Sequence, residues 1–177
     1  MSARKTRRRK RLYLLDAMSY VFRAYHAFTP QRFTSPSGVP TNAVFLFHNM
    51  LRKLLREHEP DYVAVVFESL GPTVRDKLFQ EYKAQRPPTP NDLVVQIPYI
   101  RRLCEALRLP ILEQEGYEAD DVIGTLARRA SEEGLEAVIV TSDKDMLQLV
   151  RTKDAVPTGR QGAPVQVFSP TKELLYD

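Results

Sequence analysis

The chain has 177 residues, of which 43% are hydrophobic and 27% charged, a balance that suits one folded domain with a substantial core. No apolar run approaches the roughly 18 residues of a membrane span, and no secretory signal is visible. The single cysteine, Cys104, excludes an internal disulfide, and its apolar helical context predicts a small core residue. The net charge of +4 is uneven, because residues 4–11 hold seven Lys and Arg side chains and the rest carries −3.

The basic start, residues 1–11, is interpreted as a disordered tail in front of one domain spanning residues 12–177. Such a tail can simply keep the protein in solution. It can equally act as an arm that seeks phosphates, since Lys and Arg release counterions from nucleic acid without reading its sequence. A nuclear address is a third interpretation if the source is eukaryotic.

Apolar runs and helical patterns alternate after this tail. In the first half we expect a strand at 12–15, a helix at 17–28, a loop at 29–40, a helix from a cap at Thr41-Asn42 to about 58, and a strand at 62–67. A polar and basic segment at 69–92 then leads to a helix at 93–107, a short strand at 109–112 and a helix at 118–133. The last part should hold a strand at 137–141, a helix from 145, a turn near 160 and an edge strand at 165–168 that can belong to a hairpin. This alternation predicts an α/β fold with a mostly parallel sheet and helices on both faces.

Carboxylates follow three of the expected strands. They are Asp16, Glu68 and the pair Asp143 and Asp145. Because the carboxyl ends of parallel strands meet at one edge of the sheet, we expect these acids to line one crevice.

Glu118, Asp120 and Asp121 form a further acidic group where a loop enters a helix. Taken alone, such acids are typical of a helix cap. Taken with the strand ends, seven carboxylates without an internal Lys or Arg cluster would repel one another unless a cation neutralised them. Oxygen ligands without Cys or His select Mg²⁺ or Mn²⁺, and so many acids indicate two ions about 3.5–4 Å apart.

The segment after the second strand is cationic, with Arg75, Lys83 and Arg86 spaced among prolines and Tyr82. A solvated basic loop is one interpretation. A clamp on a scissile phosphate is the other, because the segment directly follows an acid-bearing strand.

Six motifs in one order resemble the 5′-nuclease domain of bacterial DNA polymerase I, over about residues 12–155. They are Leu14-Leu-Asp-Ala-Met-Ser-Tyr-Val-Phe-Arg-Ala-Tyr-His-Ala, Gly38-Val-Pro-Thr-Asn-Ala-Val, Val65-Val-Phe-Glu, Glu81-Tyr-Lys-Ala-Gln-Arg-Pro-Pro, Gly116-Tyr-Glu-Ala-Asp-Asp-Val-Ile-Gly and Thr141-Ser-Asp-Lys-Asp-Met-Leu-Gln-Leu-Val. The resemblance implies the flap-endonuclease superfamily with a PIN-like (resolvase-like) three-layer core.

The resemblance also implies roles for residues. Two divalent ions, Mg²⁺ or Mn²⁺, would be held at Asp16, Glu68, Glu118, Asp120, Asp121, Asp143 and Asp145. The arch segment, residues 70–97, would form the helical arch through or under which a 5′ end passes. DNA contacts would come from Arg23, Arg75, Tyr82, Lys83 and Arg86, with Lys83 and Arg86 taking part in catalysis.

The expected activity is therefore divalent-metal-dependent 5′-3′ exonuclease or structure-specific flap endonuclease cleavage of DNA in replication or repair. The resemblance raises DNA with 5′ ends or flaps as substrate and a DNA polymerase as partner. It implies a cytoplasmic protein, associated with the nucleoid if bacterial.

Two features depart from the family pattern. The family usually has Asp where this chain has Glu68, which places the charge one methylene further out. In the family, a helix-hairpin-helix region that grips duplex DNA and supplies further acids to the second metal begins near the position of Asp177, so residues 12–177 are expected to lack it. Residues 158–167 also match the family only loosely.

Three other functions are weighed against this one. A truncated remnant would bind 5′ ends but cut poorly. A PIN-like ribonuclease would share the acidic crevice, but the arch motif beginning at Tyr82 argues against it. A phosphatase with an aspartyl nucleophile would want Asp-x-Asp after the first strand, and Asp16-Ala-Met offers none.

Overall fold

A computed structural model describes residues 8–27, 33–79, 81–83, 85, 87–152 and 162–177. Its centre is a six-stranded sheet in the order β3-β2-β1-β4-β5-β6, in which β1 to β5 run parallel and β6 is antiparallel to β5. The strands are β1 (Arg11–Asp16), β2 (Tyr62–Val66), β3 (Ile111–Leu112), β4 (Glu136–Val140), β5 (Val165–Ser169) and β6 (Leu174–Tyr176). The predicted mostly parallel α/β architecture is confirmed.

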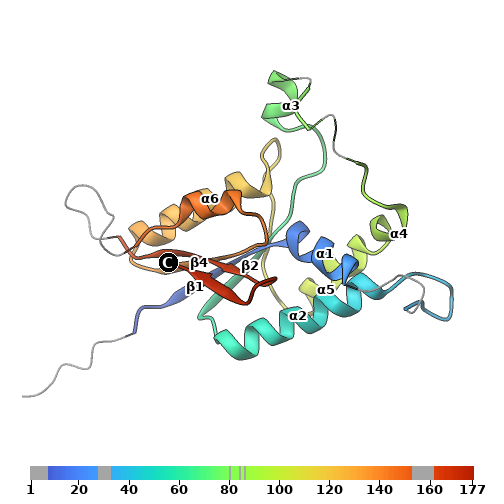
Figure 1. Ribbon diagram of the computed structural model, residues 1–177, viewed down its shortest axis with the longest axis horizontal. Coiled ribbons are helices and arrows are strands. Elements are labelled where there is room, and N and C mark those ends of the chain that lie inside the picture. The colour runs from blue at the N-terminus through green and yellow to red at the C-terminus, as the bar shows by residue number, and fades with distance from the viewer. Residues whose placement is uncertain (1–7, 28–32, 80, 84, 86, 153–161) are drawn as a thin grey trace, which may run out of the picture.

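Helices cover both faces of this sheet. They are α1 (Ala17–His26), α2 (Asn42–His58), α3 (Val74–Leu78), α4 (Asn91–Val94), α5 (Ile97–Ala106), α6 (Ala119–Glu132) and the 3-10 helix η2 (Asp145–Leu149). α6 lies on one face, α1, α2 and α5 lie on the other, and α3 stands clear of the sheet (Figure 1). The three-layer arrangement expected from the sequence is therefore present.

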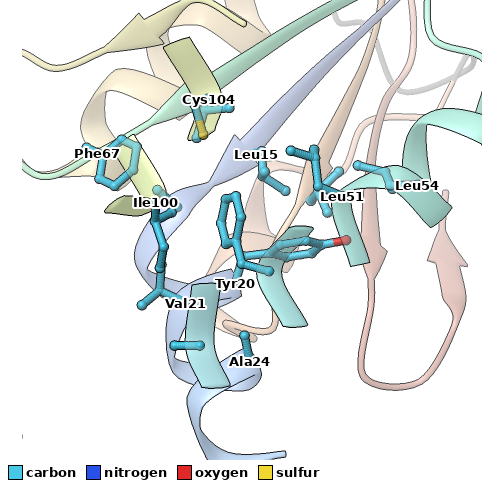
Figure 2. Packing of buried hydrophobic residues seen from close by; sticks show 14 of the residues in the cluster. Leu15, Tyr20, Val21, Ala24, Leu51, Leu54, Phe67, Ile100 and Cys104 are labelled. Atoms are coloured by element: carbon cyan, nitrogen blue, oxygen red, sulfur yellow. The ribbon is translucent and has the colours of Figure 1, made fainter. Parts of the chain in front are cut away.

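Alternation along the strands builds a separate core on each face. Tyr13 and Leu15 of β1 pack with α1, α2 and α5, whereas Leu14 packs with α6. The first of these clusters is shown in Figure 2, where Cys104 lies among aliphatic and aromatic side chains. Cys104 is fully buried, as predicted, and burial raises the pKa of its thiol to about 11. It is therefore a core residue and a poor nucleophile.

The start of α2 is capped from a distant part of the chain. Thr41 is the N-cap residue but its side chain makes no cap hydrogen bond. Instead, the buried Gln96 accepts hydrogen bonds from the backbone N–H groups of Ala43 (2.9 Å) and Val44 (3.4 Å). Gln96 also donates to Asn42 Oδ1 at 2.9 Å. The helix begins where the sequence predicts, but the expected local cap is supplied by the segment between α4 and α5.

Three expectations near the chain ends need correction. β1 begins at Arg11, inside the expected tail, because the Arg11 backbone N–H donates to Asp61 at 2.8 Å and its side chain to the His58 carbonyl. β5 is not an edge strand, since it lies between β4 and β6 and forms its hairpin with β6. The segment from Asp145 forms only five residues of 3-10 helix. The expected turn near 160 falls mostly outside the described residues.

Among the helices of the described segments, none combines the length and apolar character required to cross a bilayer.

Candidate metal and nucleic-acid site

Asp16 is the last residue of the central strand β1, at the point where the order of strands in the sheet reverses. β2 and β3 lie to one side of β1, and β4 and β5 to the other, so β1 and β4 flank the topological switch point. Open parallel sheets bind ligands in the crevice at this position. Asp16 is buried there and caps α1, accepting from the Ser19 backbone N–H at 3.1 Å. Its other oxygen accepts from Thr141 Oγ1 at 2.7 Å.

A chain of hydrogen bonds continues from Asp16 to the acids that follow β4. Thr141 Oγ1 accepts from the Asp143 backbone N–H at 3.0 Å, and Asp143 Oδ1 accepts from the Asp145 N–H at 2.9 Å. Ser19 Oγ also accepts from the Ser142 N–H at 2.8 Å. Three acids predicted from the strand ends, Asp16, Asp143 and Asp145, are thus tied into one connected turn.

The first turn of α6 brings the second group of acids. Glu118, the N-cap residue, is buried, and its backbone N–H donates to Asp121 Oδ2 at 3.3 Å. Asp120 is half-buried. Burial raises its pKa to about 6, with further contributions from Asp16, Asp143 and Glu118. The predicted helix cap and the predicted approach to the strand-end acids are therefore both present.

Mutual repulsion shows which carboxylates share the crevice. Burial is the main cause of the raised pKa of Asp16, while Asp143 and Glu68 raise it further and hydrogen bonds from Thr141 and Ser19 oppose the change. Glu68, two residues beyond β2, is half-exposed and sits at the rim. The carboxylates from β1, β2, β4 and α6 thus act on one another electrostatically.

Cations of the arch segment lie against these acids. Lys83 Nζ is 2.8 Å from Glu118 Oε1 and 3.8 Å from Glu68 Oε1, and Tyr82 donates to Glu118 Oε2 at 3.2 Å. Arg75 pairs with Asp121. The expected closeness of the basic segment to the acids is thus present for Arg75 and Lys83, and these cations come from the arch segment rather than from the strand ends.

The start of α6, the η2 helix and two residues of the arch segment line a hollow of about 410 Å³. Its walls include Arg75, Tyr82, Glu118, Asp120 and Asp145. Among the residues that the structure describes, no three acidic, His or Cys side chains stand close enough to form a ready-made metal site. The donors nevertheless suit a hard cation, since all are carboxylates and two have raised pKa values. Glu118 Oε1 is also buried without a hydrogen bond, as Lys83 approaches it outside hydrogen-bond geometry. A divalent ion therefore fits this donor set.

Five of the predicted residues that the structure describes do not line this hollow: Asp16, Arg23, Glu68, Lys83 and Asp143. Lys83 and Glu68 adjoin it through Glu118, and Asp16 and Asp143 are linked by hydrogen bonds to Asp145. Arg23 lies at a different hollow of about 290 Å³ between α1, α2 and the β5–β6 hairpin, beside Lys53 and Phe168. Arg86 lies outside the described residues. Conversely, the roles of Ser19 and Thr141 were missed, although the Asp-x-x-Ser spacing at Asp16 is typical of a helix start.

Comparison with known proteins places these observations in a family. The family described as 5′-3′ exonuclease, N-terminal resolvase-like domain, matches residues 11–172. The chain belongs to this family. A 5′-3′ exonuclease of Aquifex aeolicus is 44% identical over 141 residues, covering 80% of this chain and 48% of the relative. DNA polymerase I of Pseudomonas aeruginosa is 50% identical over 139 residues, covering 78% of this chain and 15% of the polymerase. The chain thus spans about half or less of these relatives.

Solved structures share the fold. The bacteriophage T5 protein co-crystallised with metal ions superposes with a TM-score of 0.66 at 18% identity, covering 94% of this chain and 58% of the T5 protein. The T5 flap endonuclease in a complex with DNA and metal ions gives 0.63 at 19% identity, covering 94% and 57%. These likenesses confirm the resolvase-like architecture.

Proposed function

We propose that this chain is the catalytic part of a divalent-metal-dependent nuclease that hydrolyses DNA phosphodiesters at 5′ ends and flaps. The observation that carries the proposal is the hydrogen-bonded series Asp16, Thr141, Asp143 and Asp145 at the switch point of the sheet. Buried structural carboxylates would instead be matched to fixed cations, whereas Asp16 is held beside other acids.

Six of the seven predicted carboxylates form the ligand set in this proposal, which leaves out Asp121 because it is paired with Arg75. The six are Asp16, Glu68, Glu118, Asp120, Asp143 and Asp145. Two bound Mg²⁺ or Mn²⁺ ions would supply water activation and charge stabilisation at the phosphate. Thr141 fixes the Asp16 carboxylate and the Asp143 backbone, so it orients ligands from two strands at once. The metal-bound structures of T5 5′-exonuclease support the use of divalent ions in this fold.

The arch segment supplies the substrate contacts. Lys83 lies beside Glu118 and Glu68, where its ammonium group can meet a phosphate brought to these acids. The Tyr82 ring offers a stacking surface for a base, a contact that tolerates any sequence. Arg86 follows in the same motif and offers a second group that can donate hydrogen bonds to phosphate. Structure-dependent rather than sequence-dependent recognition follows from these groups.

The relatives suggest the setting in which such a nuclease works. Several are DNA polymerase I chains, of which this chain matches about one sixth. We therefore propose a DNA polymerase, in the same chain or a separate one, as partner, with action in the cytoplasm at chromosomal DNA.

Cleavage of a 5′-labelled flap duplex tests the proposal. We expect cutting near the flap junction with Mg²⁺ or Mn²⁺ and none with EDTA. Asp16→Ala and Asp143→Ala should each lower the rate by at least about a hundredfold, because each removes a ligand. Glu133→Gln, which neutralises an exposed acid beyond the other end of α6, is the matched control and should cut as well as wild type.

Other results would redirect the proposal. Binding of the flap without metal-dependent cutting would favour a DNA-binding remnant. Faster cutting of an all-RNA flap than of the DNA flap would favour the ribonuclease. Equal cutting by wild type and Asp143→Ala would remove the acid series from the mechanism.

A further inference from the structure

Arg75 and Asp121 form a two-pronged salt bridge between α3 and α6. Arg75 Nη1 lies 2.5 Å from Asp121 Oδ2, and Nη2 lies 2.7 Å from Oδ1. This fork-to-fork pairing fixes the direction as well as the distance between the two groups. It joins two segments separated by 46 residues in the sequence.

Apolar burial does not hold α3 in place. None of its five residues is buried, and Figure 1 shows it apart from the sheet, close to the turn that precedes α6. A second polar link supports the first, because the Val74 backbone N–H donates to the Gly116 carbonyl at 2.8 Å. At the start of α3, the N-cap residue Thr73 and Asp76 form a reciprocal capping box that stiffens the short helix. The position of α3 thus depends on its polar contacts with the entrance of α6.

Asp120 and Asp121 face different neighbours. Consecutive helical residues point about 100° apart. Asp120 lines the hollow together with Glu118 and Asp145. Asp121 points toward the arch segment, where it pairs with Arg75 of α3. Both Asp121 oxygens are engaged, Oδ1 by Arg75 and Oδ2 by Arg75 and the Glu118 N–H.

We propose that Arg75 and Asp121 are the anchor of the arch segment, and that Arg75 acts as a positioning residue rather than as a phosphate contact. The anchor sets the distance from α6 at which Tyr82 and Lys83 meet Glu118. In this proposal Asp121 holds the arch segment in place, and of these two residues only Asp120 is a metal ligand. The consequence for catalysis rests on the nuclease function proposed above, whereas the salt bridge that anchors the arch segment does not depend on that function.

A charge-exchange series tests the anchor without requiring activity. The variants are Arg75→Glu, Asp121→Arg and the double variant, with Asp121→Asn and Asp120→Asn as a matched neutralising pair. Chymotrypsin cleavage after Phe79, a 65% exposed residue that no variant alters, reports opening of the segment in the absence of DNA. Calorimetric titration with Mg²⁺ reports the metal site.

The anchor predicts a specific pattern. Each single charge reversal should speed cleavage after Phe79 by about tenfold, and the double variant should restore most of the protection. Asp121→Asn should keep Mg²⁺ affinity within about threefold of wild type, whereas Asp120→Asn should lose tenfold or more. In flap cleavage, Arg75→Glu should lower kcat more than it raises KM, with partial recovery in the double variant.

Two results would overturn the inference. One is loss of Mg²⁺ binding in Asp121→Asn equal to that in Asp120→Asn, which would make Asp121 a ligand. The other is a double variant as easily cleaved as the single variants. If the variants show the expected proteolysis pattern but the wild type never cuts DNA, the proposed function is refuted and the anchor is retained.

Discussion

Thr141 orients two of the proposed metal ligands, Asp16 and Asp143. Its hydroxyl donates to Asp16 and accepts from the Asp143 backbone, so its loss frees both. We predict that Thr141→Val weakens Mg²⁺ binding and flap cleavage by about 10–100-fold, the usual cost of removing a group that orients metal ligands. Thr141→Ser keeps the hydroxyl and should stay within about threefold of wild type. Magnesium titrations of both variants measure this, and an unchanged affinity in Thr141→Val would show that the hydroxyl is dispensable.

His58 should make stability depend on pH. Burial is the main cause that lowers its pKa below 6.5, and Arg11 and Lys53 lower it further against the opposing effect of Glu57. Because the unfolded chain then binds a proton more readily than the folded one, the contribution of His58 is present above about pH 6.5 and is lost as the pH falls below it. We predict that wild type loses more stability than His58→Phe between pH 7.5 and 5.

The phenylalanine in that variant preserves ring packing against Phe168, whose centroid lies 4.6 Å from that of His58. Denaturant unfolding at several pH values gives the comparison. Parallel pH curves for the two proteins would contradict the prediction.

The start of α2 offers a test at the scale of a single element. Gln96→Leu would leave the Ala43 and Val44 N–H groups without their acceptor in a buried place, and should lower the free energy of unfolding by about 2–4 kcal/mol. Thr41→Ala removes the nominal cap residue, yet should change stability by less than about 0.5 kcal/mol, because that side chain makes no cap bond. Urea unfolding of the two variants decides whether the cap is local or distant. A larger effect at Thr41 would reverse the assignment.

The same element shows where sequence reasoning reaches its limit. Apolar periodicity predicted α2 and its end at His58, and the alternation of strands and helices predicted the parallel sheet. Neither could reveal a cap supplied from Gln96, because contacts across 53 residues leave no local pattern. The prediction that β5 lies at the edge of the sheet was wrong for a related reason, since the three residues of β6 are too few for their pattern to predict a strand.

The candidate site divides along the same line. Asp16 and Asp143 could be placed together from sequence because adjacent parallel strands must end at one edge. Asp120 and Asp121 could not be told apart, since which acid faces the arch segment depends on how α6 is rotated against the sheet. The pairing of Lys83 with Glu118 was also hidden, because it depends on the path of the chain through residues of positive φ such as Lys83 itself.

Metal binding should stabilise the whole molecule, because the proposed ligands come from β1, from the turn after β4 and from the start of α6. At a Mg²⁺ concentration about a hundred times Kd, a single site adds about 2.7 kcal/mol, which corresponds to about 5–10 °C in Tm for a chain of this size. Asp16→Asn should lose most of this increase. Without metal the variant should be at least as stable as wild type, since a buried repulsive charge is gone. Thermal unfolding with EDTA and with Mg²⁺ checks both expectations, and an equal Mg²⁺ response in both proteins would exclude Asp16 as a ligand.

The hydrogen bond between Asp16 and Thr141 joins positions 125 residues apart. During synthesis on the ribosome, the first carboxylate therefore emerges long before the hydroxyl that orients it. An amino-terminal stretch of nascent chain can form β1 and α1, but it cannot present the assembled acids until β4 has been made and has paired beside β1. The proposed nuclease activity should thus appear late and abruptly, because the acids that it requires come together only when β4 has paired.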